Sequence, residues 1–581
     1  MYTISKNSQI VLSLLKAHNI KHIVINPGTT NMPIIRGVQN DPFFTCYSVV
    51  DERSAMYFAI GLYLELGVPI ATTCTSAQAT RNYIPGLTEA FYKHIPILAI
   101  TTSKHPKYTG QEYLQGPDQT SLPVDAVKKT FALPYVANHI DELHCVRVAN
   151  EAILELTHRT SGPVQLNIHM IDSEASMYTY PKLPEVRVIK RYMVWDEWDV
   201  LFEKENKKIM IVIGEHRPFS KKQIESLTSF VETHNAFIYV NHLSNYHGRY
   251  AVSANLALSC MDNKEFISDY KPDILITIGG QTGDYPIFGK LSDGGERSFE
   301  HWRISESGSI VDTYDKLTKV FECPFEVFFN RLKGDTPVQH TYFEEWEKMT
   351  QNVSIPEDLS FSNAYLAQQL HKSIPENSYL NLAILNSLRN WSFFAFDSSI
   401  TCYSNVAAFG IDGCMSVLLG QSVASDRLSF MVIGDLSFFY DMNSLGIRHL
   451  KNNIRILLIN NNCGAEFKLY SHPAYQFGKE GDPFIAAVGH NSDAKGWIEA
   501  NNFKYLSAKN KDEFLKNKDE FLQDSDRSIV FEVFTTPEDE SMALKMIIDS
   551  NRRATLRSKI RDKIQPLIGE RGVQLLKKIV K

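Results

Sequence analysis

The stretch of sequence that decides the fold reads LSFMVIGDLSF over residues 428–438 and, after an interval of about one helix, ILLINNNCG over residues 456–464. Each half is a short apolar run that ends in polar residues. Two such runs separated by a helical interval predict a βαβ crossover of a parallel sheet. Because open α/β sheets bind ligands at the carboxyl ends of their strands, we expect both polar clusters at one binding edge.

The polar residues of these clusters suit a hard cation that holds a diphosphate. Asp435 offers a carboxylate, Asn461 an amide oxygen and Cys463 a backbone carbonyl, and Mg²⁺ prefers oxygen ligands of this kind. Gly434 and Ser437 open the intervening helix, whose free N–H groups would face the same anion. Asp and Asn at strand ends are often only turn and cap residues, so these clusters alone leave a structural role open.

The composition is that of an ordinary soluble globular protein. The chain has 581 residues, of which 44% are hydrophobic and 22% charged, with a net charge of −6. Such a balance favours neither a nucleic-acid nor a membrane partner. The sequence shows no signal peptide and no run of ~18 apolar residues, which predicts a cytoplasmic protein. None of the eight cysteines forms a Cys-x-x-Cys pair, which argues against disulfides or zinc.

Alternating strand and helix patterns predict three α/β domains, each with a doubly wound parallel sheet. The first covers residues 1–180, with strands near 22–26, 46–50, 70–76 and 97–101. The central domain covers residues 181–340, and the third covers residues 341–540 and contains the stretch quoted above. Residues 541–581 form a helical tail rich in Lys and Arg, which we expect to be a solvated face or to pack on a partner subunit.

One glycine-rich turn in the central domain requires a choice between two interpretations. Residues 279–283 read GGQTG after an apolar strand pattern. The turn lacks the third glycine of a dinucleotide-binding loop and is not followed by an obvious helix. Structural packing is therefore favoured over a bound nucleotide.

Taken together, the motifs resemble those of the thiamine-diphosphate enzymes of the decarboxylase and carboligase group, and look closest to the menaquinone-pathway carboligases. The resemblance spans nearly the whole chain and rests on the order and separation of the motifs. The matching stretches are Asp51-Glu52-Arg53, residues 75–90 (TSAQATRNYIPGLTEA), Asn386-Ser387-Leu388, Tyr403-Ser404-Asn405, Gly410-Ile411-Asp412-Gly413, Gly434-Asp435-Leu436-Ser437 and Asn460-Asn461-Asn462. The resemblance implies the three-domain fold of that family, with thiamine diphosphate and Mg²⁺ as cofactors.

The resemblance implies a catalytic role for Glu52, because a buried glutamate of the family hydrogen-bonds the aminopyrimidine ring of the cofactor. Glu52 follows Val49-Val50 and precedes an amphipathic helix. We therefore expect apolar burial that raises the pKa of its carboxyl. The alternative is a carboxylate that only interacts with the dipole of a helix N-terminus.

Further residues match family positions around the cofactor. Ile411 matches the aliphatic residue that bends it, and the carbonyl of Phe409 would accept from its exocyclic amine. Gln119 matches a glutamine that faces the reacting carbon. The remaining cofactor-binding candidates are Thr75, Ser76, Asn82, Ser387, Gly434 and Ser437.

The departures from the family pattern concern the substrates. The menaquinone-pathway carboligases present arginines to carboxylate-rich substrates, because guanidinium groups bind carboxylates bidentately. At the matching places this sequence has Thr30, His105, Trp391 and Val406. Losing several contacts of about 1.5–3 kcal/mol each predicts poor affinity for isochorismate and oxoglutarate, and hence another donor and acceptor. The residues that remain as substrate-binding candidates are Thr30, Asn31, Arg81, His105 and Arg389.

The resemblance implies decarboxylation of a 2-oxo acid and transfer of the acyl-anion equivalent to an acceptor. It also implies a homodimer or a dimer of dimers. A simple 2-oxo acid decarboxylase stays possible, although its usual paired histidines are missing near residues 104–119. A catalytically silent scaffold of the same fold and an oxidoreductase that uses the central domain stay possible as well.

Overall fold

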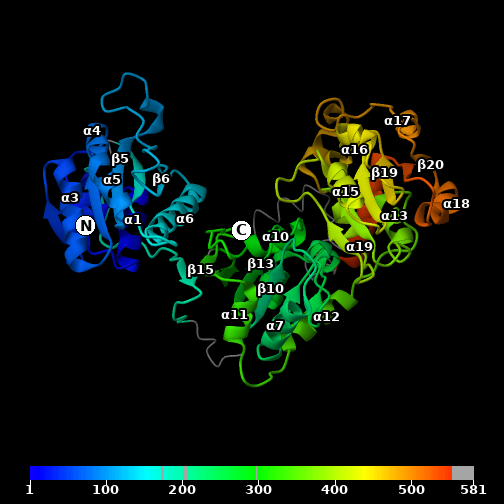
Figure 1. Cartoon of the computed structure of the whole chain (residues 1–581), viewed down its shortest axis with the longest axis horizontal. Coiled ribbons are helices and arrows are strands. Elements are labelled where there is room, and N and C mark those ends of the chain that lie inside the picture. The colour runs from blue at the N-terminus through cyan, green and yellow to red at the C-terminus, as the bar shows by residue number, and fades with distance from the viewer. Residues whose placement is uncertain (172–173, 175, 200–206, 296, 553–581) are drawn as a thin grey trace, which may run out of the picture. The chain divides into compact units, whose positions relative to one another are not determined.

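The structure, a computed structural model, describes residues 1–171, 174, 176–199, 207–295 and 297–552 (Figure 1). The chain forms two compact units. The first comprises residues 1–199 and 300–323, and the second comprises residues 200–299 and 324–581, each within the described ranges. Across those ranges, no helix has the length and apolar character needed to span a membrane.

The first unit contains a six-stranded parallel sheet in the order β3-β2-β4-β5-β7-β6. The strands predicted from the sequence are all present in it, and β6 and β7 complete the sheet. The strands are β2 (His22–Ile25), β3 (Thr45–Ser48), β4 (Ile70–Cys74), β5 (Ile97–Lys104), β6 (Lys129–Leu133) and β7 (Val164–Met170).

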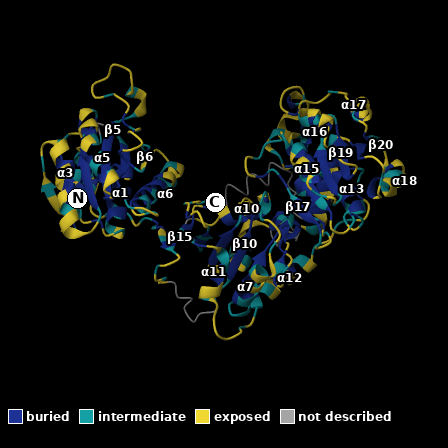
Figure 2. Ribbon diagram, in the orientation of Figure 1, coloured by how far each residue is buried: buried dark blue, intermediate teal, exposed yellow. Residues whose placement is uncertain are grey.

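Helices cover both faces of this sheet, as predicted for a doubly wound fold. The helices α1 (Lys6–Ala17), α2 (Met32–Gln39) and α6 (His139–Glu155) share one core with Ile23 and Ile25. The helices α3 (Glu52–Leu66) and α5 (Ile84–Tyr92) share the other core with Val24. This alternation follows from the two-residue period of a strand, and Figure 2 shows the resulting buried strands in dark blue.

The first unit also holds shorter elements. The strands β1 (Tyr2–Thr3) and β8 (Tyr178–Tyr180) pair antiparallel. The strands β14 (Glu300–Ile304), β15 (Leu317–Glu322) and β9 (Lys190–Met193) are parallel neighbours. The short helix α4 (Gln78–Asn82) follows β4.

The second unit begins with four parallel strands in the order β12-β11-β10-β13. Three of these strands were predicted from their apolar runs. The elements are β10 (Ile209–Ile213), α7 (Lys221–Glu232), β11 (Ala236–Tyr239), β12 (Ala251–Val252), α8 (Asn255–Cys260), β13 (Ile274–Ile278), α10 (Tyr285–Ser292), α11 (Phe325–Leu332) and α12 (Thr341–Gln351).

The expectation that no helix follows the GGQTG turn was wrong. The helix α10 begins two residues after Gly283, because the side chain of Asp284 caps it by accepting from the Ile287 N–H at 3.3 Å. The turn itself packs closely, since a Cβ on Gly214 would lie 1.8 Å from the carbonyl oxygen of Gly280. This contact supports the structural interpretation of these glycines.

The rest of the second unit contains another six-stranded parallel sheet, in the order β17-β16-β18-β19-β21-β20. Counted within each sheet, the strand order is the same as in the first unit. The strands are β16 (Tyr379–Leu382), β17 (Thr401–Tyr403), β18 (Ser429–Gly434), β19 (Ile454–Asn460), β20 (Lys504–Ala508) and β21 (Ile529–Phe534). The predicted crossover is confirmed, because β18 and β19 are parallel neighbours joined through α16 (Asp435–Asp441).

Helices again cover both faces of this second six-stranded sheet. The helices α13 (Asn363–Leu370), α14 (Asn386–Trp391), α18 (Lys511–Leu522) and α19 (Pro537–Asn551) share one core. The helices α15 (Cys414–Val423), α16 and α17 (Lys495–Ala500) share the other. The described part of the predicted tail lies in α19, which packs against this fold through Ala543 and Ile547. Residues 553–581 of that tail lie outside the described residues.

Candidate active site

The predicted site residues gather at the carboxyl ends of the two six-stranded sheets. In each sheet the chain order reverses beside the first strand, which is β2 in one sheet and β16 in the other. Ligands of open α/β folds bind at such switch points. Thr30, Thr75 and Ser76 follow β2 and β4, whereas Ser387 and Asp435 follow β16 and β18.

In the first unit, a cluster of threonine hydroxyls lies behind these loops. The Thr30 hydroxyl is 2.8 Å from that of Thr75 and 2.7 Å from that of Thr102, and it accepts from the Ser76 N–H at 3.1 Å. Thr30 and Asn31 are both fully buried. Because both side chains are buried, they shape the loop. A substrate could contact them only if other residues moved aside.

Glu52 is the first residue of α3, and Asp51 caps this helix by accepting from the Arg53 N–H at 3.0 Å. The structure brings two predicted cofactor residues together here, because Asn82 Nδ2 donates to Glu52 Oε2 at 3.3 Å. The predicted burial of Glu52 is not found within the first unit, since the side chain is only partly covered. Helix α3 leaves its N-terminus at the surface of this unit, so the first unit by itself does not enclose the carboxyl.

Gln119 lies entirely in the core, where both ends of its side-chain amide are used. Its oxygen accepts from the Ala77 N–H at 2.7 Å, and its nitrogen donates to the Thr102 carbonyl at 2.9 Å and to Asn167 at 3.1 Å. Gln119 thus fixes the turn that follows Thr75 and Ser76.

The two predicted substrate cations of the first unit lie nearer the surface. Arg81 is exposed and donates to the Asp118 carbonyl at 2.6 Å. His105 Nδ1 accepts from the Lys107 N–H at 3.2 Å.

In the second unit, Asp435 is a buried carboxylate surrounded by N–H donors. Its Oδ1 accepts from the Leu436 N–H at 2.7 Å, and its Oδ2 accepts from the Asn461 N–H at 3.1 Å. His490 Nε2 also lies 3.1 Å from Oδ2. Only 2% of Asp435 is exposed, and burial raises the pKa of this carboxyl.

The other two predicted metal ligands follow directly on β19. Asn461 and Cys463 are both buried. The Cys463 carbonyl accepts from the Ala465 N–H at 3.0 Å, and its thiol lies 3.7 Å from the Asn461 amide oxygen. Burial raises the pKa of this thiol to about 12, so Cys463 offers its backbone rather than a thiolate.

Two residues, Ile411 and Phe409, are expected to support the rings of the cofactor. Ser437, on α16, donates to the carbonyl of Ile411 at 2.5 Å. Phe409 has a left-handed backbone with φ of 59°, which is unusual for a bulky residue and is typical of functional sites.

Ser387 and Arg389 lie on α14. Ser387 is buried and accepts from Asn363 Nδ2 at 3.5 Å. Arg389 forms a bidentate ion pair with Glu466, with distances of 2.6 and 2.7 Å. Its charge is therefore compensated by a carboxylate that no motif in the sequence marks.

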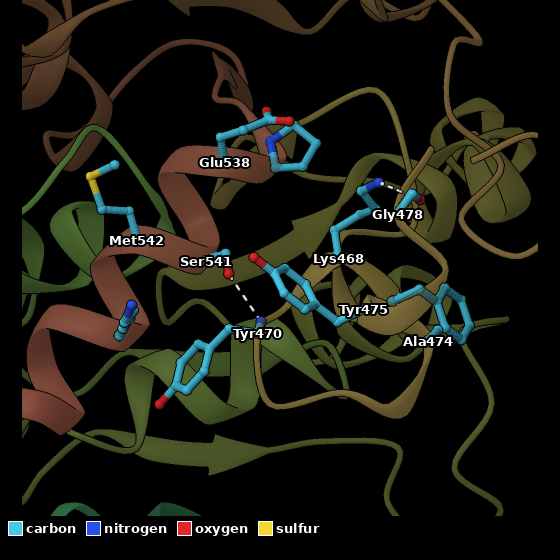
Figure 3. A pocket seen from close by; sticks show the side chains of 11 residues that line it. Lys468, Tyr470, Ala474, Tyr475, Gly478, Glu538, Ser541 and Met542 are labelled. Atoms are coloured by element: carbon cyan, nitrogen blue, oxygen red, sulfur yellow. Dashed lines mark hydrogen bonds between the residues drawn. The ribbon is translucent and has the colours of Figure 1, made fainter. Parts of the chain in front are cut away.

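Beside the segment that follows Cys463 lies a cavity of about 580 Å³, formed by η6 (Ala465–Lys468), η7 (Pro473–Gly481) and the first turns of α19 (Figure 3). Aromatic and flexible side chains line it together with two lysines. Lys468 is paired with Asp482. The residues that give the cavity this character are Phe467, Lys468, Tyr470, Tyr475, Met542 and Lys545.

Two strained turns were not foreseen from the sequence. Ala77, after β4, has φ of 66° and ψ of −117°, and Leu385, after β16, has φ of 67° and ψ of −122°. Glycine is the residue that usually adopts positive φ, so no sequence signal marked them. Each turn precedes a short helix at the switch point of its sheet. The two loops therefore have the same strained backbone conformation at equivalent places.

The donor set in the second unit fits a magnesium ion and its diphosphate. Asp435 is a buried carboxylate, and Asn461 and Cys463 add amide and carbonyl oxygens, which are the hard ligands that Mg²⁺ prefers. Among the described residues, no group of three or more His, Cys, Asp or Glu side chains could hold a metal. A sheet with Glu52 on the helix after β3, and a second sheet of the same strand order with these oxygen donors after β18 and β19, are the features of a thiamine-diphosphate enzyme.

Comparisons with known proteins agree with this class. Residues 6–122 match the family model described as "Thiamine pyrophosphate enzyme, N-terminal TPP binding domain". The chain is 34% identical over 575 residues to the 2-succinyl-5-enolpyruvyl-6-hydroxy-3-cyclohexene-1-carboxylate synthase of Bacteroides thetaiotaomicron and 36% identical over 571 residues to that of Phocaeicola vulgatus; each match covers 96% of this chain and 98% of the relative. The synthase of Desulfotalea psychrophila is 30% identical over 533 residues, which cover 90% of this chain and 96% of the relative.

The chain therefore belongs to the family of the 2-succinyl-5-enolpyruvyl-6-hydroxy-3-cyclohexene-1-carboxylate synthases. It is an enzyme that uses thiamine diphosphate and a divalent metal, Mg²⁺, and its reaction forms a carbon–carbon bond after a 2-oxo acid loses CO₂. The predictions of fold class, cofactors and carboligation are confirmed at this level.

Proposed function

We propose that this enzyme uses a 2-oxo acid donor whose only carboxylate is the one lost as CO₂, and transfers the remaining acyl group to a carbonyl or activated alkene of a small acceptor. The cofactor chemistry in this proposal is carried by the buried Asp435 carboxylate, which accepts from the Asn461 N–H at 3.1 Å where β18 and β19 end side by side. This arrangement supports a metal site at which one face of the cofactor would be held.

The donor class is supported by the places where the family would offer arginines. Thr30, Trp391 and Val406 are at most 1% exposed. The hydroxyl of Thr30 is held by other threonines, and Trp391 Nε1 donates to Asn363 at 2.8 Å. A second carboxylate on the donor would therefore meet no guanidinium group at these positions.

The nearby cations of the second unit are already compensated. Arg389 is paired with Glu466, and Lys468 is paired with Asp482. A charged side chain on the donor would have to displace one of these carboxylates, whereas a small neutral side chain would not. The cavity of Figure 3 suits the acceptor, because it is lined by aromatic side chains and by Lys545. It lies beside the segment that follows Cys463.

The roles of the chain's own residues follow from their chemistry. Asp435, Asn461 and the Cys463 carbonyl would hold Mg²⁺, Ile411 and Phe409 would support the rings, and Glu52 would hold a proton at the pyrimidine. When bound, the cofactor supplies the electron sink for decarboxylation. Asn82, which bonds Glu52 at 3.3 Å, would orient that carboxyl.

A homodimer belongs to this proposal, because the first unit by itself leaves the Glu52 side chain partly uncovered. The helix that begins at Glu52 carries an exposed apolar stripe on its surface. Tyr57 is 46% exposed, Phe58 43% and Leu64 67%. A second copy that covers α3 would bury this stripe and the carboxyl together. Phe58→Asp is then expected to give monomers in analytical ultracentrifugation and to lose activity.

A second candidate is the reaction in the relatives' name, formation of a 2-succinyl cyclohexene carboxylate. It is favoured by 34–36% identity along nearly the whole chain. This candidate needs a dicarboxylate donor, such as oxoglutarate, and isochorismate as the acceptor. The two candidates therefore differ in the charge of the donor.

The experiment that decides is a mass-spectrometric screen of 2-oxo acids for CO₂ release, with and without aldehydes, isochorismate and other acceptors. Pyruvate or another monoacid is expected to be consumed faster than oxoglutarate, with a ligated product. If oxoglutarate with isochorismate is the only pair of substrates that is turned over, the second candidate is supported. Free aldehyde as the only product would indicate a simple decarboxylase. Glu52→Gln is expected to lower turnover about 100-fold or more, and full turnover in this variant would contradict its role.

A further inference from the structure

A loop formed by residues 489–494, which we call the histidine loop, is bound to the asparagines that follow β19. The Gly489 N–H donates to the Asn462 carbonyl at 2.9 Å, and the Asn491 N–H donates to the Asn462 side chain at 2.7 Å. Asn462 Nδ2 donates back to the Asn491 side chain at 3.3 Å. Asn462 thus holds this loop from both its backbone and its side chain.

Asn460 holds the far end of the same loop. Its Nδ2 donates to the Ser492 carbonyl at 2.9 Å and to Glu532 Oε1 at 2.8 Å. Glu532, on β21, is fully buried and also accepts from the Ala494 N–H at 3.1 Å. Two of the three consecutive asparagines therefore serve the histidine loop, and only Asn461 is left as a candidate metal ligand.

The loop places one imidazole against the predicted metal-binding carboxylate. His490 Nε2 lies 3.1 Å from Asp435 Oδ2, and the two side chains are 18% and 3% exposed. His490 Nδ1 accepts from the Ser492 N–H at 3.0 Å. Because Nδ1 is an acceptor, the proton of the neutral ring is on Nε2, and this nitrogen donates to Asp435.

The two carboxylate oxygens of Asp435 accept different numbers of hydrogen bonds. Oδ2 accepts from His490 and from the Asn461 N–H, whereas Oδ1 accepts from the Leu436 N–H. A carboxylate oxygen offers about two acceptor sites. These bonds leave acceptor capacity on Oδ1 for a cation and hold Oδ2 against turning.

We propose that His490 is a positioning residue that fixes the carboxylate of Asp435 in the orientation that binds Mg²⁺. The proposal rests on the assignment of Asp435 to the metal in the proposed function. Groups that orient metal ligands typically change metal affinity by 10–100-fold when they are removed. In this proposal, the hydrogen bonds of Asn460, Asn462 and Glu532 hold the histidine loop beside the proposed metal ligands.

The chain offers a closely matched control for this histidine. His472 Nδ1 accepts from the Ala474 N–H at 3.0 Å, the same two-residue cap that His490 makes with Ser492. The ring of His472 lies edge-on to Phe467 at 5.2 Å, and that of His490 lies edge-on to Phe439 at 5.4 Å. The difference is that Nε2 of His490 faces Asp435.

The test compares His490→Phe, His490→Gln, His472→Phe and Asp435→Asn in the full chain. The apparent Kd for Mg²⁺ is measured by tryptophan fluorescence at saturating thiamine diphosphate, and the melting temperature is measured without metal. His490→Phe is expected to raise the Kd 10–100-fold, whereas His490→Gln, which keeps an N–H donor, stays within a few-fold of the wild type. His472→Phe is expected to leave the Kd unchanged.

Each other outcome has a definite meaning. Unchanged Mg²⁺ affinity in His490→Phe, together with a loss in Asp435→Asn, would overturn the role of His490 and leave the metal site intact. Equal losses in His490→Phe and His472→Phe would also overturn it, because both would then reflect general loop structure. Unchanged affinity in Asp435→Asn would instead contradict the proposed function. A metal-free melting temperature of His490→Phe near that of the wild type, together with weaker Mg²⁺ binding, separates positioning from folding.

Discussion

The hydroxyl of Ser437 donates a hydrogen bond of 2.5 Å to the carbonyl oxygen of Ile411. This bond joins the first turn of α16, which also carries Asp435, to the loop that carries Phe409. The residues proposed for the metal and those proposed for the rings of the cofactor are thus coupled through one partly buried hydrogen bond. A change at this contact should affect both stability and cofactor affinity.

Ser437→Ala removes that hydrogen bond and leaves the Ile411 carbonyl without its donor. We expect a loss of about 1 kcal/mol in the free energy of unfolding and an affinity for thiamine diphosphate that is about fivefold weaker. Urea denaturation and calorimetry measure the two effects. Ser437→Thr keeps the hydroxyl and serves as the control. Wild-type affinity in Ser437→Ala would show that the contact does not support the cofactor.

Gly28 lies where the loops after β2 and β4 meet. A Cβ at this position would be 2.3 Å from the Cβ of Thr75, so Gly28→Ala should force the loops apart and cost about 1–3 kcal/mol of stability. Gly289→Ala is the matched control, because Gly289 lies in α10 with no atom within 4 Å of its added Cβ. That change should stabilise by about 0.5–1 kcal/mol. Thermal denaturation measures both effects. If Gly28→Ala were as stable as Gly289→Ala, the close packing of Gly28 against Thr75 would be contradicted.

Glu540 predicts a dependence of stability on pH. It is buried and accepts from the Asn363 N–H and the Thr535 hydroxyl, yet burial raises the pKa of its carboxyl from 4.5 to about 7. The folded protein therefore holds this proton more tightly than the unfolded chain. The stability that the protonated form contributes is complete below pH 4.5 and is lost as the pH rises to 7, by about 3 kcal/mol.

Glu540→Gln removes this titration and keeps a neutral group of the same shape. Its free energy of unfolding, relative to the wild type, is expected to rise as the pH goes from 5 to 8. Urea midpoints at several pH values test this difference. Parallel curves for the two proteins would mean that Glu540 does not titrate in this range.

Glu466 is predicted to affect the selectivity of the enzyme between donors of different charge. Glu466→Gln breaks the bidentate pair and releases the guanidinium of Arg389. We expect the ratio of kcat/KM for oxoglutarate to that for pyruvate to rise about tenfold, since a charge-assisted contact contributes about 1.5–3 kcal/mol. Asp482→Asn, which releases Lys468 instead, is the companion variant. An unchanged ratio in Glu466→Gln would place Arg389 away from the donor.

The sequence was sufficient to predict the elements whose signals are local. The apolar runs at 428–434 and 456–460 predicted β18 and β19, and the polar residues at their ends, Asp435 and Asn461, lie close together as expected. Parallel strands buried on both faces produce continuous apolar runs, which explains why these strands were clear.

Contacts between residues distant in the sequence could not be predicted in the same way. His490 is 55 residues from Asp435, and Glu466 is 77 residues from Arg389. Their partners depend on strand order and loop paths. The strain at Ala77 and Leu385 was hidden because neither residue is glycine. The burial predicted for Glu52 stays a prediction, because in the first unit its side chain begins a surface helix and is only partly covered, and the proposed second chain would have to complete the cover.

The most direct test of the central claim, that Asp435 and Asn461 hold the metal of a thiamine-diphosphate site, is calorimetric titration of the Asp435→Asn variant with thiamine diphosphate at a Mg²⁺ concentration that saturates the wild type. The wild type is expected to bind tightly, with the binding abolished by EDTA, and the variant is expected to show no detectable heat of binding. Wild-type affinity in Asp435→Asn would show that Asp435 does not hold the metal.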